Sequence, residues 1–290
     1  MRFACIDVGS NTTRLLVADT VPGGLQDVLN ERAFTLIGRS LGDSGRIPLE
    51  KLEETAAVVA AQAERARELG ADRIRAVATA AIRRAENARE LVDAIEREAG
   101  LPLEVLQGVD EARLAFHGAA RASGVLGRLA VIDVGGGSTE IAIGTAGGSV
   151  MQVESIPVGS SVLAEQHLAS DPPSAAELEA LRDAVGGAFA HFEPPAVDHA
   201  VAVGGSASSL LHLAGTELGP TELARALDAL CAEPAEVLGA RVALDPIRVR
   251  LLPAGVLILA ELARRLHQPL RICKGGLREG VIMEMMGRPE

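Results

Sequence analysis

Residues 133–140 read Asp-Val-Gly-Gly-Gly-Ser-Thr-Glu and lie between two apolar segments. This order predicts a strand, a glycine turn and a returning strand. Three successive glycines remove every Cβ from the tip, so backbone N–H groups can approach an anion, and Ser138 and Thr139 add hydroxyl donors. Asp133 places a carboxylate at the strand end, where it could hold a divalent cation or a metal-bound water. Taken alone, the stretch fits either a phosphate cradle or an ordinary glycine hairpin whose Asp caps the turn.

A second copy of this pattern occupies residues 7–14, which read Asp-Val-Gly-Ser-Asn-Thr-Thr-Arg. The two copies align without a gap, so Asp7 matches Asp133 and Arg14 matches Glu140. Such self-similarity predicts two related halves, each with its own phosphate-binding hairpin. The opposite charges of Arg14 and Glu140 predict different tasks. We expect the first hairpin mainly to bind phosphate and the second mainly to organise metal and water.

The remaining sequence alternates strand and helix patterns, which is typical of an α/β protein with mixed sheets. In the first half we expect strands at 2–8, 15–18, 25–37, 72–78 and 103–106, a loop at 38–48, and helices at 49–69, 86–99 and from 108–113 to about 122. In the second half we expect strands at 129–134, 140–144, 149–158, 199–203 and 270–273, and helices at 162–168, 174–189, 221–231, 235–242, 253–266 and up to about 286. The predicted domains are residues 1–124 and 125–290, with the last helix free to pack back on the first domain.

Composition excludes several classes of function. The 290 residues carry a net charge of −11 and contain neither Trp nor Tyr, which argues against nucleic acid or an acidic membrane as a partner. The three cysteines are far apart and lack metal-ligand spacing, so we expect neither disulfides nor zinc. The longest apolar run, residues 251–260, is too short to span a bilayer. These features predict a soluble, cytoplasmic protein.

Glycine turns follow predicted strands at four places, namely Gly9, residues 135–137, residues 204–205 and residues 275–276. In open α/β sheets, ligands bind beyond the carboxyl ends of the strands. The four turns therefore predict one cleft for a polyphosphate or a nucleotide. Neither GxxxxGK[ST] nor GxGxxG occurs, which disfavours Walker-type and dinucleotide sites.

Two charged residues at strand ends are candidates for chemistry. Arg83 could clamp a phosphate with two hydrogen bonds, or it could be a solvated residue at a helix start. Glu111 could act as a general base on an attacking water, if burial or the neighbouring Asp110 raises its pKa. Acidic residues in a first helical turn are also favoured by the helix dipole alone, so both interpretations stay open.

Taken together, the motifs resemble the exopolyphosphatase and guanosine pentaphosphate phosphohydrolase family, a branch of the actin-like, ribonuclease H-like superfamily. The resemblance rests on residues 7–14, 78–83, 108–113, 133–140, 204–206, 253–255 and 275–280. It implies two ribonuclease H-like (actin-like ATPase) domains with mixed sheets and an active site in the cleft between them.

The resemblance also implies roles for individual residues. The family releases terminal phosphate from a phosphoanhydride chain with Mg²⁺, and Mn²⁺ is the alternative metal. Glu111 matches the catalytic base, Arg83 the substrate arginine, and Asp133 a catalytic acidic group. The implied metal ligands are Asp133, Glu140 and Asp7. The implied phosphate-binding residues are Ser10, Asn11, Thr12, Arg14, Gly135, Gly136, Gly137, Ser138, Gly205 and Ser206.

Three departures from the family pattern bear on function. Asp110 stands where the family usually has a second Glu, and Ala80-Ala81 replace a frequent hydroxyl near the Arg83 strand end. Long members carry a further helical HD-like domain after the two halves, which leaves processive handling of long polyphosphate open here.

The expected function is hydrolysis of inorganic polyphosphate from its end. Guanosine pentaphosphate is the alternative substrate within the family, and a homodimer is one assembly that the sequence leaves open. From another class, an actin-like module or kinase that binds ATP without this hydrolysis is the alternative, and Glu111 argues against it because a pure binder would not need that carboxylate.

Overall fold

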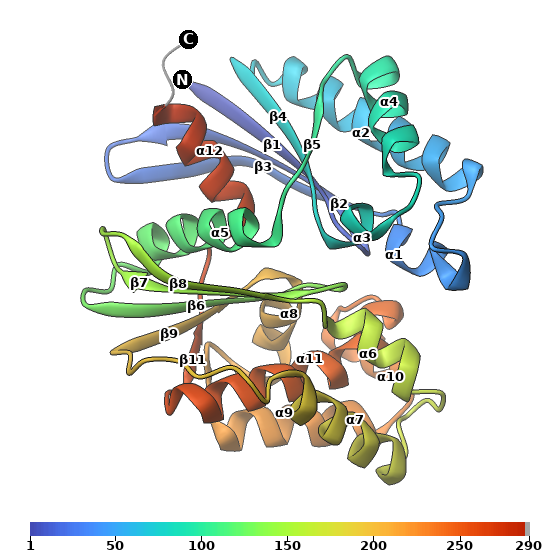
Figure 1. Cartoon of the computed structure of the whole chain (residues 1–290), viewed down its shortest axis with the longest axis vertical. Coiled ribbons are helices and arrows are strands. Elements are labelled where there is room, and N and C mark those ends of the chain that lie inside the picture. The colour runs from blue at the N-terminus through green and yellow to red at the C-terminus, as the bar shows by residue number, and fades with distance from the viewer. Residues whose placement is uncertain (288–290) are drawn as a thin grey trace. The chain divides into compact units, whose positions relative to one another are not determined.

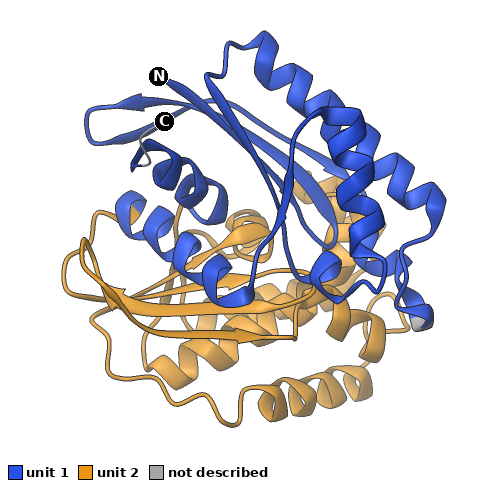
Figure 2. Ribbon diagram, turned by 45° about the horizontal axis from the view of Figure 1, so that its top comes forward, with its two compact units in different colours: residues 1–122, 275–290 blue, residues 123–274 orange. Residues whose placement is uncertain are grey.

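The structure, a computed structural model, describes residues 1–287 without the side chain of Asp43. The chain forms two compact units, which Figure 2 shows in different colours. Unit 1 comprises Met1–Ala122 together with the segment that begins at Gly275, and unit 2 comprises Ser123–Lys274. The last three residues of the predicted second domain lie outside the described residues. A compact unit need not fold independently, so the predicted domain boundary at 124/125 stays a prediction, as does the predicted location of the active site.

Unit 1 is built on a five-stranded mixed sheet with the strand order β3-β2-β1-β4-β5. Its strands are β1 (Arg2–Val8), β2 (Thr12–Val21), β3 (Gly24–Phe34), β4 (Arg73–Ala78) and β5 (Leu103–Val105). Its helices are α1 (Ile37–Ser40), the 3-10 turn η1 (Gly42–Ser44), α2 (Leu49–Glu68), α3 (Ala80–Arg84), α4 (Ala88–Ala99), α5 (Gly108–Ser123) and α12 (Leu277–Gly287) (Figure 1). β1 pairs antiparallel with β2 and parallel with β4, so a hairpin comes first and a helical crossover follows.

Side chains of β1 alternate between the two faces of this sheet. Ala4, Ile6 and Val8 belong to a buried core that also contains side chains of α2 and α4. Phe3 and Cys5 belong to a second core with side chains of α5 and α12. The sheet is therefore the middle of three layers, and α12, from the far end of the chain, completes one outer layer.

Unit 2 is built on a six-stranded mixed sheet with the order β10-β11-β9-β6-β7-β8. Its strands are β6 (Arg128–Val134), β7 (Thr139–Thr145), β8 (Val150–Ile156), β9 (His199–Val203), β10 (Glu217–Leu218) and β11 (Leu270–Ile272). Its helices are α6 (Ser160–His167), α7 (Ala175–Ala188), α8 (Gly204–Ala214), α9 (Pro220–Ala232), α10 (Ala235–Val242) and α11 (Pro246–Leu266). Ala130, Ile132 and Val134 of β6 pack with side chains of these helices in one core.

The two units share one topology, which confirms the repeat predicted from the two hairpins. In each unit the first strand pairs antiparallel with the second and parallel with the fourth. The alignment of residues 7–14 with residues 133–140 also holds in the strand pairing. Asp7 lies opposite Arg14 in the β1–β2 ladder, and Asp133 lies opposite Glu140 in the β6–β7 ladder. The predicted fold class, α/β with two mixed sheets, is confirmed as well.

Several element boundaries differ from the prediction. The expected loop at 38–48 contains α1 and η1, and the glycines at 204–205 open α8 directly. The largest difference is α11, which was expected to begin at Pro253 but begins at Pro246. Asp245 caps this helix by accepting from Ile247 N at 2.8 Å, and a proline in the first turn suits a helix start. Pro246 therefore marks the helix start, and Pro253 lies inside the helix.

A capping box opens α7, as the spacing of Ser174 and Glu177 in the sequence predicts. Ser174 Oγ accepts from Glu177 N at 3.3 Å, and the Glu177 carboxylate accepts from Ser174 N at 2.7 Å. The same carboxylate accepts from Ala169 N and Ser170 N, and it is hydrogen-bonded to the Ser170 hydroxyl. Hydrogen bonds from Ser170 and Ser174 hold the pKa of Glu177 well below its usual range.

Glu177 should therefore make unfolding pH-dependent. Its pKa is lower in the folded than in the unfolded chain, so its stabilisation is present above the unfolded pKa of about 4.3 and is lost as the pH falls towards the folded pKa. We expect Glu177→Gln to lower the thermal midpoint of unfolding at pH 7 and to lower it less near pH 3. Glu179→Gln, on the same helix, is the control. An effect of Glu177→Gln that is equal at both pH values would contradict this account.

Candidate active site

The hairpin between β6 and β7 has the form predicted for residues 133–140. Gly135 N donates to the Ser138 carbonyl at 3.0 Å and so closes the turn. Among residues 1–287, no protein acceptor takes a hydrogen bond from the amides of Gly136, Gly137 or Ser138. These N–H groups are available to an anion such as phosphate.

The carbonyl groups of this hairpin are held by the start of α6. Ser160 donates to the Gly135 carbonyl from N at 2.9 Å and from Oγ at 3.2 Å. Ser161 N donates to the Gly136 carbonyl at 3.0 Å. Because C=O and N–H of one trans peptide point in opposite directions, these bonds aim the amides of Gly136 and Gly137 away from α6.

Gly159 allows α6 to come this close. A Cβ at Gly159 would lie 2.5 Å from the carbonyl oxygen of Gly136 and 2.7 Å from that of Gly135, well inside normal contact distance. Only a residue without a side chain fits there. The sequence reading missed Gly159 and the two serines after it, although a Gly-Ser-Ser sequence after the third strand is a recognisable helix start.

The first hairpin is supported in the same way. It closes with the equivalent hydrogen bond from Gly9 N, also of 3.0 Å. The Ser10 carbonyl accepts from Gly38 N at 2.7 Å, and the Asn11 carbonyl accepts from Leu36 N at 3.0 Å. Leu36 has a φ of 51°, a left-handed conformation that is costly for leucine, so the surrounding contacts must hold it there.

The second hairpin carries two facing carboxylates. Asp133 and Glu140 lie directly opposite each other in the β6–β7 ladder, and Glu140 is buried and accepts from Ser155 Oγ at 3.0 Å. Like charges that face each other across a ladder are unfavourable, which makes this position suited to a cation. Gly204 contacts the Asp133 carboxylate so closely that a Cβ there would lie 2.0 Å from Oδ1.

The first hairpin has a different charge arrangement. Asp7 lies opposite Arg14, whose Nε donates to Thr12 Oγ1 at 3.3 Å. Asp7 Oδ1 is buried and accepts no hydrogen bond within the described residues. Burial raises the pKa of the Asp7 carboxyl, and the positive charges of Arg278 and Arg14 oppose this shift.

The two strand-end candidates of unit 1 are bonded to each other. Arg83 Nη1 donates to Glu111 Oε2 at 3.1 Å and to the Leu106 carbonyl at 2.6 Å. Glu111 lies in the first turn of α5, where its N–H donates to the Gln107 carbonyl at 2.9 Å. The Glu111 side chain is only 9% exposed and that of Arg83 is 20% exposed. Both side chains are thus largely buried and paired with each other, and their predicted roles in the chemistry stay predictions.

The predicted phosphate-binding pair Gly205 and Ser206 forms the first turn of α8. Backbone N–H groups at such a turn have no partner within the helix and favour anions. Ser206 is 1% exposed, and Gly255 of α11 packs against it, since a Cβ at Gly255 would lie 3.1 Å from Ser206 Oγ. The backbone of this turn is thus better placed for binding than the serine side chain.

Each unit gathers its own set of predicted residues. Unit 1 brings Asp7 opposite Arg14 beside the hairpin residues Ser10, Asn11 and Thr12, and separately joins Arg83 to Glu111. Unit 2 brings Asp133 and Glu140 together at the glycine hairpin, with the start of α8 against Asp133.

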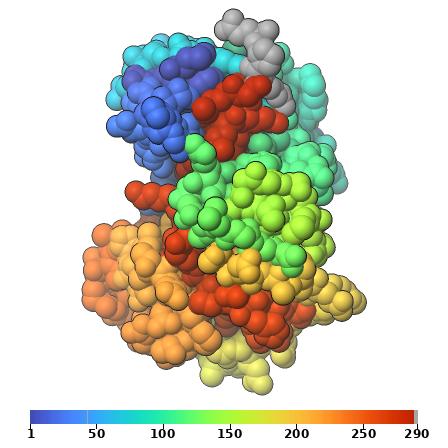
Figure 3. Space-filling model, turned by 90° about the vertical axis from the view of Figure 1, so that its left-hand side faces the viewer, coloured from blue at the N-terminus to red at the C-terminus, as the bar shows by residue number. Residues whose placement is uncertain are grey.

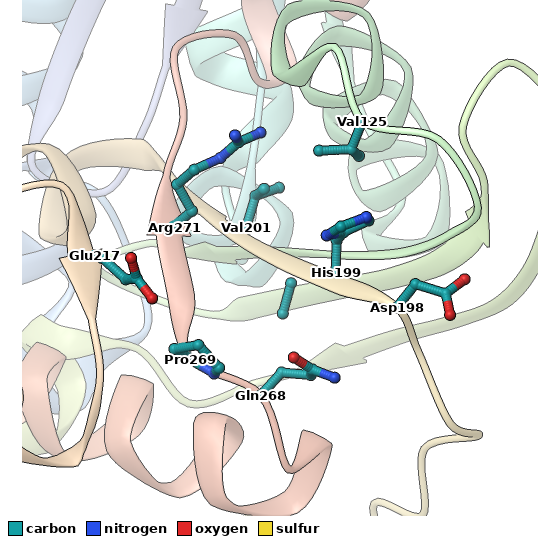
Figure 4. A pocket seen from close by; sticks show the side chains of 9 residues that line it. Val125, Asp198, His199, Val201, Glu217, Gln268, Pro269 and Arg271 are labelled. Carbon is teal, nitrogen blue, oxygen red and sulfur yellow. The ribbon is translucent and has the colours of Figure 1, made fainter.

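A pocket in unit 2 lies elsewhere. It has a volume of about 170 Å³ and is lined by Val125, Asp198, His199, Ala200, Val201, Glu217, Gln268, Pro269 and Arg271 (Figure 4). These residues include the amino-terminal part of β9, whereas Gly204 and Gly205 follow its carboxyl end. The pocket contains no predicted site residue, and we assign it no part in the chemistry.

No three His, Cys, Asp or Glu side chains in residues 1–287 form a ready-made metal site. No helix in the same range is long and apolar enough to cross a membrane.

The fold and the glycine hairpins define a phosphate-handling α/β protein, and comparison with known proteins identifies its family. The model of the Ppx/GppA phosphatase family matches residues 16–289, so the chain belongs to this family. Its fold is accordingly the actin-like fold that the resemblance implied.

Individual relatives agree with this assignment. The chain is 31% identical to Exopolyphosphatase 1 of Mycobacterium bovis over 305 aligned positions, which cover 99% of this chain and 88% of the relative. It is also similar to a crystal structure of the Aquifex aeolicus member of the Ppx/GppA family, with a TM-score of 0.84, 30% identity and coverage of 99% and 97%. An exopolyphosphatase structure from Cytophaga hutchinsonii shares the fold, with a TM-score of 0.86, 21% identity and coverage of 99% and 98%.

Gly159→Ala should impair phosphate binding by displacing the second hairpin. The added methyl group would push the Gly135 and Gly136 carbonyls and tilt the amides beside them. We expect a roughly tenfold or greater loss of affinity for tripolyphosphate, measured by calorimetry. Gly187→Ala in α7 is the matched control, because nothing lies within 4 Å of its Cβ position. Unchanged affinity in Gly159→Ala would show that the support from α6 is not needed.

Proposed function

We propose that this protein is an exopolyphosphatase, which hydrolyses the terminal phosphoanhydride bond of inorganic polyphosphate. The observation that carries the proposal is the buried Glu111 carboxylate, held by Arg83 at the first turn of α5. A protein that only binds phosphate would gain nothing from burying a carboxylate next to an arginine that could bind phosphate. A hydrolase needs such a group to accept the proton of the attacking water.

The roles of the other residues follow from their chemistry. The oxygen of a water molecule attacks the terminal phosphorus while Glu111 accepts a proton from that water. The bond from this phosphorus to the bridging oxygen breaks, and the shortened chain leaves with the bridging oxygen. Arg83 can offer a further N–H to a phosphate oxygen while it holds Glu111 in place. The hairpin amides of Gly136 and Gly137 stabilise negative charge on the phosphate chain, as preorganised donors do in phosphoryl transfer.

A divalent metal fits the acidic groups of these hairpins. Asp133 faces Glu140 across a ladder, and Asp7 has a buried oxygen that accepts no hydrogen bond in the described part of the chain. Mg²⁺ usually keeps several waters and takes one or two carboxylates plus substrate phosphates, so a complete protein cage is not required. We propose Mg²⁺, with Mn²⁺ as the alternative, held by Asp133 and Glu140 of unit 2. The predicted role of Asp7 as a further ligand stays a prediction. When bound, the cation would neutralise charge on the phosphate oxygens.

The choice of polyphosphate over guanosine pentaphosphate follows the relatives, of which the mycobacterial proteins are named exopolyphosphatases. We further propose a cytoplasmic location, since the cysteines Cys5, Cys231 and Cys273 are all free. A homodimer stays a prediction.

The base assignment is tested by Glu111→Gln. The amide keeps the shape of the side chain but cannot accept the proton, so we expect kcat for phosphate release from polyphosphate to fall by about 10²- to 10⁴-fold while binding is kept. Asp110→Asn is the matched control, because the neighbouring Asp110 side chain is 54% exposed and pairs only loosely with Arg113 at 3.6 Å.

The outcomes separate the proposals. Release from polyphosphate but not from guanosine pentaphosphate supports the first choice, and the reverse would move the assignment to the other substrate. No release from either by the wild-type protein would reject hydrolysis. Full activity in Glu111→Gln would reject the base.

The division of labour between the hairpins is tested by metal dependence. Asp133→Ala removes one of two facing carboxylates, so we expect the Mg²⁺ concentration for half-maximal activity to rise at least tenfold. Arg14→Ala removes a charge from the first hairpin and should raise KM for polyphosphate with little change in the Mg²⁺ requirement. The opposite pattern would contradict the division.

A further inference from the structure

The helix that carries Glu111 presents a second feature on the same side. Leu114 and Gly118 follow Glu111 at the i+3 and i+7 positions of α5, so the three residues share one face. All three are buried. The element that packs on this face therefore fixes the position of α5 along its axis and its rotation about that axis, and with them the position of Glu111.

The backbone of α12 and the residues just before it lie directly on that face. A Cβ at Gly280 would lie 1.9 Å from the Leu114 carbonyl oxygen, and a Cβ at Gly118 would lie 2.2 Å from the Gly276 carbonyl oxygen. Real Cβ atoms essentially never come within 3.0 Å of such atoms, so at these glycines the two segments touch backbone to backbone. Gly275 adds a third close approach, with a φ of +90° and a Cβ position 2.6 Å from the Gly118 carbonyl oxygen.

This contact gives the glycines at 275–276 a use that differs from the phosphate turn expected there. They let the chain return to unit 1 and pack against α5. The sequence pattern Gly-Gly-Leu-Arg-Glu-Gly at 275–280 is thus explained by backbone contact within unit 1.

α12 also packs on β1. Leu277 and Val281 share a core with Phe3 and Cys5, and Asp7 follows these on the same face of the strand. Arg278 Nη1 also donates to Asn30 Oδ1 of β3 at 2.9 Å. Figure 3 shows α12 in red against the blue N-terminal strands, and Figure 1 shows it beside α5. One helix therefore contacts both elements that carry the acidic groups of unit 1.

We propose that α12 is a positioning element for catalysis, in which the glycine contacts at Gly118, Gly276 and Gly280 set where Glu111 lies relative to Asp7. The proposal rests on Glu111 being the general base. In this proposal the three glycines contact no substrate and affect the reaction only through the position of α5. A methyl group at Gly280 must move the Leu114 carbonyl by about 1.5 Å to reach ordinary contact at 3.4 Å, and a misplacement of about 1 Å can already cost about 10² in rate.

The test compares Gly280→Ala and Gly118→Ala with two controls. Gly186→Ala places a methyl group in open space on α7 and should change nothing. Met285→Ala removes a buried side chain from the far end of α12 and should lower the thermal midpoint without pushing α5. We expect kcat for polyphosphate to fall about 10- to 100-fold in both glycine variants, with KM unchanged, and to stay near the wild-type value in both controls at a temperature where every variant is folded.

A double-mutant cycle decides whether the glycines act through Glu111. If they do, Gly280→Ala lowers kcat in the wild-type background but adds almost nothing to the residual rate of Glu111→Gln. Equal factors in both backgrounds, or a matching kcat loss in Met285→Ala, would overturn the proposal and leave a purely structural contact. If neither glycine variant folds, Leu277→Ala in the first turn of α12 replaces Gly280→Ala in the double-mutant cycle, and the same two outcomes decide.

Failure of this proposal is distinguishable from failure of the proposed function. An active wild type and an impaired Glu111→Gln, together with a fully active Gly280→Ala, reject only the positioning role. An inactive wild type rejects the hydrolase itself.

Discussion

The backbone carbonyl groups of the two hairpins are fixed by amides that follow the third strand of each unit. In unit 1 the bonds run from Gly38 and Leu36 to Ser10 and Asn11, and in unit 2 from Ser160 and Ser161 to Gly135 and Gly136. A peptide whose carbonyl is fixed also has a fixed N–H direction. The hairpin amides are therefore preorganised for an anion before any ligand arrives, and they need no large reorganisation to bind one.

The same scaffold is used twice with different side chains. Asp7 and Asp133 occupy equivalent ladder positions, but the residue opposite is Arg14 in one unit and Glu140 in the other. An aspartate facing an arginine is neutral as a pair and leaves the amides to attract phosphate, whereas two facing carboxylates favour a cation. The predicted division of the hairpins into a phosphate site and a metal site rests on this difference in charge.

The sequence predicted what depends on local pattern and missed what depends on contacts between distant segments. All strands except the short β10, both hairpins and the capping box at Ser174 follow from alternation, glycine runs and cap residues, and the structure confirms them. The pairing of Arg83 with Glu111 joins residues 28 positions apart. Gly159 contacts carbonyl groups 23 and 24 positions before it, and Gly280 contacts Leu114 across 166 positions. No periodicity encodes such contacts. The predicted roles of the site residues stay predictions that the arrangement within each unit supports.

Binding of a phosphate chain to the preorganised hairpin amides is the central claim. Its most direct test is the amide NMR spectrum of the ¹⁵N-labelled Glu111→Gln protein during titration with tripolyphosphate and Mg²⁺. The account predicts large, saturable shifts for the amides of Gly136, Gly137 and Ser138, and none for Gly186 and Gly187 in α7. Saturable binding by calorimetry without shifts at either hairpin would contradict it.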